Sequence, residues 1–108
     1  MLRLAWFTTG RGPGSRRLFS LVRSEIEADE LNASVEFVFC NREFGETDAT
    51  DGFLRLVQDS DVPLVTFSSR RFRRERGGGP FSDHRIEFHK AVLDRISSYQ
   101  PDICVFSG

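Results

Sequence analysis

The chain has 108 residues and a formal net charge of -1, with 39% hydrophobic and 29% charged residues. These values are typical of one small globular domain, and they exclude a disordered or collagenous chain. No apolar run approaches the roughly 18 residues that span a membrane, and the chain opens on a strand-like segment instead of a signal peptide. We therefore expect a cytoplasmic protein with no membrane partner. The nearly balanced charge also disfavours a dedicated nucleic-acid binder.

Short apolar segments alternate with segments of helical periodicity along the chain. The apolar segments are rich in β-branched or aromatic side chains and predict strands over residues 2–9, 34–40, 62–67 and 103–106. Apolar residues at helical spacing predict three helices: residues 15–29, a short helix from Asp48 to about residue 59, and a longer helix capped by Ser82 and stopped by Pro101.

This alternation predicts a three-layer α/β fold, with a Rossmann-like parallel sheet of about four strands and helices on both faces. In the common doubly wound arrangement the first strand is central, which predicts the strand order 3-2-1-4. Ligands in such sheets bind beyond the carboxyl ends of the strands. We expect the site beyond the first and fourth strands, whose ends lead into residues 9–14 and 107–108.

The two cysteines, Cys40 and Cys104, lack the spacing of a metal site, and no other pattern predicts a bound metal. The predicted strand order separates them by about 9–10 Å, because one strand lies between theirs. A disulfide needs Cα atoms within about 7 Å of each other. We expect two buried, free thiols.

A glycine-rich turn joins the first predicted strand to the first predicted helix. Gly10, Gly12, Gly14 and Ser15 supply the small residues and the hydroxyl with which such a turn holds an anion at a helix N-terminus. The turn lacks the GK[ST] of a P-loop and the spacing of a dinucleotide fingerprint. It predicts a phosphate site or, alternatively, a tight turn whose glycines serve the backbone geometry alone.

The order of these segments, with TGRGPGSR after the first strand and PDICVFSG at the last, resembles the N-terminal half of phosphoribosylglycinamide formyltransferase, a member of the formyltransferase superfamily. The resemblance covers essentially the whole chain, although residues 44–80 match only in layout. It implies that residues 1–108 form a formyltransferase-like, substrate-phosphate-binding N-terminal domain, from which the catalytic C-terminal part is absent.

The resemblance also implies roles for individual residues. Gly12, Gly14, Ser15 and Arg16 fall on the loop that binds the substrate phosphate, with an added residue pair and a cation in place of the family's Asn. Arg85 falls on an arginine that helps to hold the folate, although a solvated residue in a first helical turn is an equal alternative. The implied reaction transfers a formyl group from 10-formyltetrahydrofolate, as co-substrate, to glycinamide ribonucleotide in purine biosynthesis.

No catalytic residue is expected in this chain, because the family's catalytic Asn, His and Asp lie beyond the matched residues. We expect His84 and His89 to be surface residues, and Asn41, which matches an Asn that ends the second strand, to cap that strand. A chain of this kind is expected to be inactive alone. The alternative function is a stand-alone phosphate- or nucleotide-binding module without catalysis.

Five arginines fall between Arg70 and Arg76, and three glycines follow them. This charge density, without an apolar period, predicts a mobile, solvated loop over residues 68–80. Two alternatives are an anion-gathering lip over the glycine loop and, with interleaved Phe side chains, a nucleic-acid contact. The last strand leaves an apolar edge, which predicts self-association.

Overall fold

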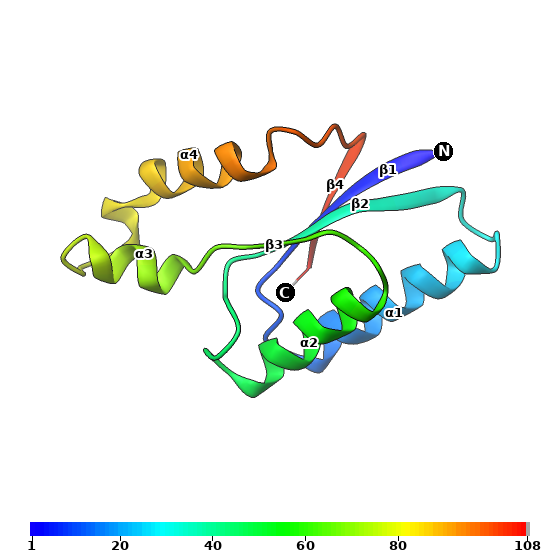
Figure 1. Ribbon diagram of the computed structural model, residues 1–108, viewed down its shortest axis with the longest axis horizontal. Coiled ribbons are helices and arrows are strands. Elements are labelled where there is room, and N and C mark those ends of the chain that lie inside the picture. Colours follow the sequence, from blue (N-terminus) through cyan, green and yellow to red (C-terminus); the bar gives the residue numbers. More distant parts are fainter. Residues whose placement is uncertain (108) are drawn as a thin grey trace.

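The computed structural model describes residues 1–107. The elements in chain order are β1 (Leu2–Thr8), α1 (Pro13–Glu27), β2 (Ala33–Cys40), α2 (Asp48–Asp59), β3 (Leu64–Thr66), α3 (Ser69–Glu75), a 3-10 turn (Phe81–Asp83), α4 (Arg85–Ile96) and β4 (Ile103–Ser107). The four strands are parallel and follow the order β3-β2-β1-β4 (Figure 1). The predicted Rossmann-like α/β fold and its strand order are confirmed.

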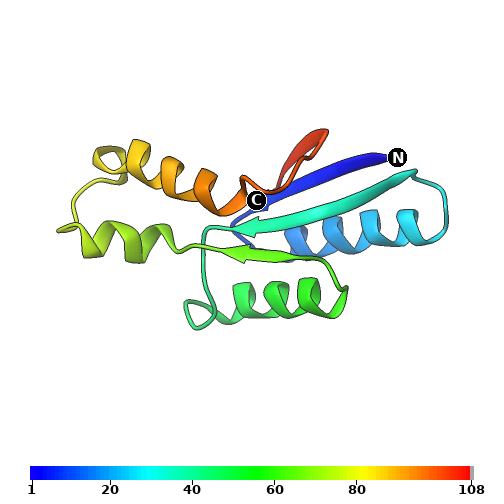
Figure 2. The ribbon, with the colours of Figure 1, turned by 45° about the horizontal axis from the view of Figure 1, so that its top comes forward.

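Two hydrophobic clusters lie on opposite faces of the sheet. Helices α1 and α2 cover one face, where Trp6, Phe19 and Phe53 are fully buried. Helices α3 and α4 lie on the other face, where Phe72 and Phe88 pack against residues of β1 and β2. Figure 2 shows α3 and α4 extending past the carboxyl ends of the strands. The three layers therefore leave the carboxyl edge of the sheet flanked by helices on both sides.

Local signals explain where the first two helices begin. Helix α1 begins at Pro13, two residues earlier than predicted, because the fixed φ of proline suits the first helical position. Helix α2 begins at the predicted Asp48, but its cap is Thr47, whose hydroxyl accepts a hydrogen bond of 3.1 Å from the N–H of Thr50. Both helices thus start directly above the carboxyl edge.

The prediction of a mobile loop over residues 68–80 is wrong for its first half, which forms α3. The Ser68 hydroxyl caps this helix by accepting a 3.0 Å hydrogen bond from the N–H of Arg71. Phe72, only 5% exposed, anchors the helix against Phe67 and Phe88, with ring centroids 5.5 and 5.3 Å away. The charged side chains face outward around this one buried ring, which is why no apolar period was evident.

The N-terminus of the last helix also differs from the prediction. Ser82 does not cap it, because residues 81–83 form the 3-10 turn and α4 begins only at Arg85, after His84. Gly77, Gly78 and Gly79 all have positive φ, so the turn that reverses the chain between α3 and α4 uses the conformational freedom of glycine.

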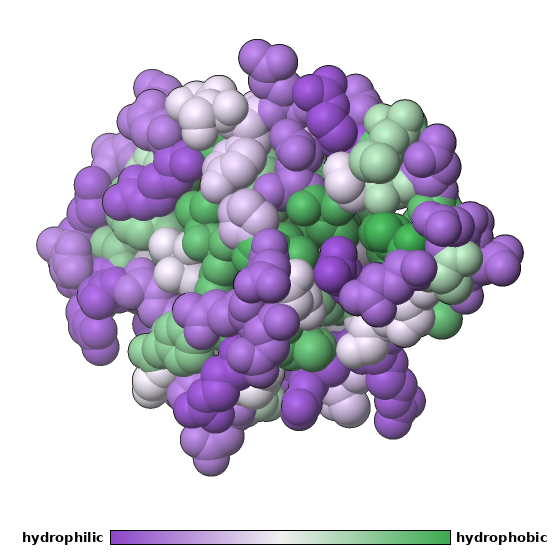
Figure 3. Space-filling model, turned by 45° about the vertical axis from the view of Figure 1, so that its right-hand side comes forward, coloured by the Kyte–Doolittle hydropathy of each residue, from purple (hydrophilic) through white to green (hydrophobic). Residues whose placement is uncertain are grey.

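Strand β4 pairs only with β1 among the described residues, so it forms one edge of the sheet. Its Ile103 and Phe106 are 46% and 77% exposed. Cys104 on the same strand is exposed, which corrects the expectation of two buried thiols, whereas Cys40 is buried and both cysteines are free. Figure 3 shows hydrophobic surface open to solvent between hydrophilic groups. No helix within residues 1–107 is long and apolar enough to cross a membrane.

Candidate functional site

Three strands end together at the carboxyl edge. Thr8 of β1 is in register with Cys40 of β2 on one side and with Ser107 of β4 on the other. Because the chain leaves β1 for α1 and β2 for α2 at this edge, the glycine loop and Asn41 lie there too. The predicted location of the site is therefore an edge that carries polar groups from three neighbouring strands.

The glycine loop is held in place by short polar contacts. The N–H of Gly10 donates a 3.0 Å hydrogen bond to the hydroxyl of Thr8, and the Thr50 hydroxyl lies 3.4 Å from the carbonyl oxygens of Thr9 and Gly10, to which it donates. Gly10 has a φ of 64°, and a Cβ at this position would lie 3.2 Å from the Phe53 ring. Glycine at position 10 therefore allows the positive φ of the turn and its close approach to α2.

The four residues that match the family's phosphate loop differ in the groups that they expose to solvent. Gly12 is the N-cap of α1 and offers no side-chain cap, and Gly14 is exposed, with open space for at least 4 Å around the place that a Cβ would take. The Ser15 side chain is buried, and its hydroxyl accepts a 3.4 Å hydrogen bond from Thr8. The Arg16 guanidinium lies against Gly52 of α2, where a Cβ would come within 3.4 Å of Nη1. Apart from exposed Arg11 and Arg16, this loop therefore presents backbone groups to solvent, because Gly14 has no side chain and the Ser15 hydroxyl turns inward.

Arg85 stands apart from the loop. It is exposed in the first turn of α4 and has no hydrogen bond or ion pair of its side chain with any residue in the range 1–107. His84, beside it, forms a 2.8 Å hydrogen bond between Nε2 and the carbonyl oxygen of Gly78, so it stabilises the glycine turn. The role of Arg85 in holding a folate stays a prediction.

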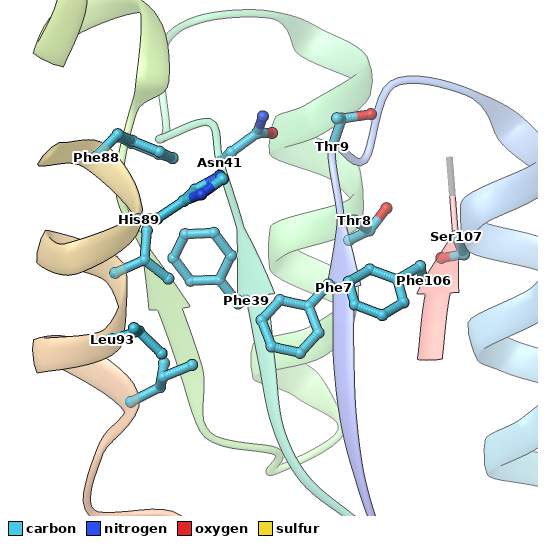
Figure 4. Close-up of a pocket in the computed structure, with 12 residues that line it drawn as sticks. Phe7, Thr8, Thr9, Phe39, Asn41, Phe88, His89, Leu93, Phe106 and Ser107 are labelled. Carbon is cyan, nitrogen blue, oxygen red and sulfur yellow. The ribbon is translucent and has the colours of Figure 1, made fainter. Parts of the chain in front are cut away.

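An apolar groove of about 650 Å³ lies between α4 and the strands β1, β2 and β4 (Figure 4). Its floor consists of Phe7, Phe39 and Phe106, which occupy one register position on three adjacent strands. The Phe7 and Phe106 rings are stacked, with centroids 5.1 Å apart. Leu93 of α4, 61% exposed, forms part of the opposite wall. An apolar strand pattern is typical of core residues, and only the strand pairing places these three rings on one common surface.

Polar groups gather at the carboxyl end of this groove. Thr8, Thr9, Asn41, His89 and Ser107 line it there. The Asn41 Oδ1 is buried and has no hydrogen-bond partner among the described residues, which is costly for a polar atom. His89 is exposed, as expected, but it lines the groove near Asn41. The arrangement can hold an apolar ligand body and orient it through a few polar contacts.

Cys40 ends β2 at the same edge, where its side chain is buried. Burial raises the pKa of its thiol above the usual value, which keeps it protonated at neutral pH. The carboxyl edge therefore offers hydrogen-bond donors, acceptors and apolar surface instead of an activated thiol.

The arginines of α3 fall into two groups. Arg71 forms an ion pair with Glu43, and Arg76 pairs with Glu87 at 3.0 Å while its guanidinium lies 3.5 Å above the Phe72 ring. These pairs attach α3 to the loop after β2 and to α4. The other arginines of the helix have no acidic partner within residues 1–107.

Comparisons of the chain with models of protein families, with curated proteins and with solved structures found no match.

Proposed function

We propose that this chain is the substrate-binding part of a formyltransferase-like enzyme. In that role it binds the phosphate of glycinamide ribonucleotide, which accepts a formyl group from 10-formyltetrahydrofolate. The observation that carries the proposal is the N-terminus of α1, which opens directly after the carboxyl end of β1 with an exposed Gly14 and no side-chain cap. The sequence resemblance supports the choice of reaction, and the strand order supports the choice of edge.

The first turn of α1 has the donors that a phosphate needs. The N–H groups of Gly14 and Ser15 have no carbonyl partner within the helix, because the first N–H groups of any α-helix lack one. The helix is 15 residues long, and its dipole places about half a positive charge at this end. Its first turn holds no acidic residue that would oppose an anion. Backbone groups, not the Ser15 hydroxyl, would therefore bind the phosphate.

The chain's own residues would bind and position the substrate without accelerating the reaction. Phosphate contacts far from the reacting amine act equally on the ground state and the transition state, so they lower KM and leave kcat unchanged. The residues that match the family pattern do not include its proton-transfer groups. We expect residues 1–108 alone to give no formyl transfer above background, and turnover by the purified chain would contradict this assignment of roles.

The phosphate loop is tested by a charge placed at Gly14. Gly14→Asp has room for its side chain and introduces a carboxylate that repels phosphate, whereas Gly14→Asn is a control of nearly the same size without the charge. We expect the unaltered chain to bind glycinamide ribonucleotide in the millimolar range, about 4 kcal/mol. A tenfold excess over Kd would then stabilise it by about 1.4 kcal/mol and raise Tm by about 6 °C.

The expected result is that Gly14→Asp loses this rise in Tm and Gly14→Asn keeps most of it. If Gly14→Asp keeps the full rise, phosphate does not bind at α1 and the proposal is wrong. Equal binding of the ribonucleotide and of unrelated phosphate esters would instead favour the alternative, a phosphate-binding module without catalysis. Circular dichroism of both variants checks that the fold is intact.

A further inference from the structure

A hollow of about 180 Å³ adjoins the apolar groove, because Asn41 lines both of them. It lies between the loop that follows β2 and the outer side of α3. The residues around it are Asn41, Arg42, Glu46, Ser69, Arg70, Arg73 and Phe81. No residue of the glycine loop takes part, so this hollow is distinct from the N-terminus of α1.

The charge inside this hollow is unbalanced. Arg42, Arg70 and Arg73 form no ion pair with any residue of the described chain, and Glu46 is the single carboxylate in the lining. Glu46 already accepts a 2.6 Å hydrogen bond from the N–H of Glu43. Three arginines without an ion pair thus line the hollow together with one carboxylate, which is already hydrogen-bonded.

The unpaired state of Arg70 and Arg73 contrasts with that of two neighbouring arginines, one in α3 and one at its C-terminal cap. Arg71 and Arg76 both have carboxylate partners, Glu43 and Glu87, and neither of these two carboxylates lines the hollow. Arg42 and Arg73 are only partly exposed. Unpaired charge that is withdrawn from water raises the free energy, and an anion in the hollow would lower it.

We propose that Arg42, Arg70 and Arg73 bind the phosphate of a phosphomonoester whose apolar body lies in the adjoining groove. Guanidinium groups match the oxygens of phosphate in pairs, which favours this dianion over a halide or a single carboxylate. Ser69 adds a hydroxyl to the lining.

The sizes of the two spaces support a ligand of two parts. A volume of 180 Å³ is below the usual range of a whole small-molecule site and suits a phosphate group, whereas the 650 Å³ of the groove lies within that range. The aromatic floor of the groove favours a ring or a short apolar chain. The net charge of -1 disfavours a nucleic-acid backbone, which would need a basic stripe.

Phenyl phosphate is the probe that tests both parts, with inorganic phosphate for comparison. Binding is measured by isothermal titration in the Gly14→Asp background, so that the N-terminus of α1 cannot contribute. We expect phenyl phosphate to bind about tenfold more tightly than inorganic phosphate, because its ring removes apolar surface of the groove from water.

Substitutions in the hollow and in the groove should then affect the two ligands differently. The double variant Arg42→Gln with Arg73→Gln should weaken both ligands by tenfold or more, as expected for lost charge-assisted hydrogen bonds. Arg74→Gln is the matched control, because Arg74 is exposed on the same helix and lines neither space. Leu93→Asp should weaken phenyl phosphate and leave inorganic phosphate nearly unchanged.

Two outcomes would overturn the proposal. Equal losses in Arg74→Gln and in the double variant would mean that α3 attracts anions only through its general charge. Equal affinities for phenyl phosphate and inorganic phosphate would mean that the groove takes no part in binding the ligand. Because Gly14→Asp is present throughout, either failure leaves the test of the α1 loop unaffected.

Discussion

Phe72 holds α3 on the protein, and its removal provides a sharp test of how this helix is stabilised. Seven residues are too few for an isolated helix, since isolated helices shorter than about 12 residues are marginal in water. Phe72 is 5% exposed and is the helix's only buried side chain. We therefore expect Phe72→Ala to detach α3 as a unit, and the arginine hollow to be lost with it.

The size of the effect follows from the contacts of the ring. Large-to-small changes of a buried Phe cost about 3–5 kcal/mol. Because the other residues of α3 are partly or fully exposed, its side chains have room to relax, and we expect a cost near about 3 kcal/mol. Edge-to-face contacts with Phe67 and Phe88 and the Arg76 guanidinium above the ring are all lost. Phe72→Leu keeps most of the volume and should cost about 1 kcal/mol.

Urea unfolding measures this cost through the fluorescence of Trp6, the single tryptophan, which is fully buried on the opposite face of the sheet. Hydrogen exchange of the α3 amides reports the local detachment separately. A loss below about 1 kcal/mol in Phe72→Ala, with α3 amides as protected as in the unaltered chain, would refute this account. The helix would then have to be stabilised by its ion pairs.

Three further outcomes are expected. The hydrogen bonds from Arg3 lower the pKa of Asp102 in the folded chain, so the stability that this pair contributes is complete above the pKa of an unfolded Asp. This stability is lost as the pH falls through the folded pKa. The difference in unfolding free energy between the unaltered chain and Asp102→Asn should therefore shrink from pH 6 to pH 3, and a constant difference would contradict this prediction. Exposed Cys104 should react at once with a thiol reagent and buried Cys40 only on unfolding, so that two rapid equivalents in the native chain would be inconsistent with the fold. Sedimentation should show association that increases with concentration through the edge strand β4 and is reduced by Phe106→Lys; a monomer at every concentration would disprove it.

The sheet and its order were predictable because they follow from local patterns and one general rule. Apolar runs bounded by turn residues predict strands without knowledge of their partners, and right-handed crossovers between parallel strands leave few arrangements to choose from. The carboxyl-edge location of the glycine loop follows from the same two facts. Strand and helix bounds shifted by a few residues at most, as at Pro13, where the cap decides the start.

The candidate site was only partly predictable from the sequence. The glycine loop is visible as a motif, but the inward turn of Ser15 toward Thr8 depends on a contact across the loop. Phe7, Phe39 and Phe106 look like ordinary core residues in a strand pattern. Whether a helix covers these three rings depends on where α4 packs against the sheet. In the structure α4 leaves a groove above the rings.

Helix α3 shows most clearly what the tertiary structure decided. The segment RRFRRER has strong local charge and one aromatic residue, so on its own it has too little apolar surface to offset the entropy of ordering. Its helix exists because Phe67 and Phe88 bury Phe72, and because Glu43 and Glu87 pair with its arginines. These partners lie on other elements, so local sequence determined the layered sheet, and only long-range packing determined the helix beside its carboxyl edge.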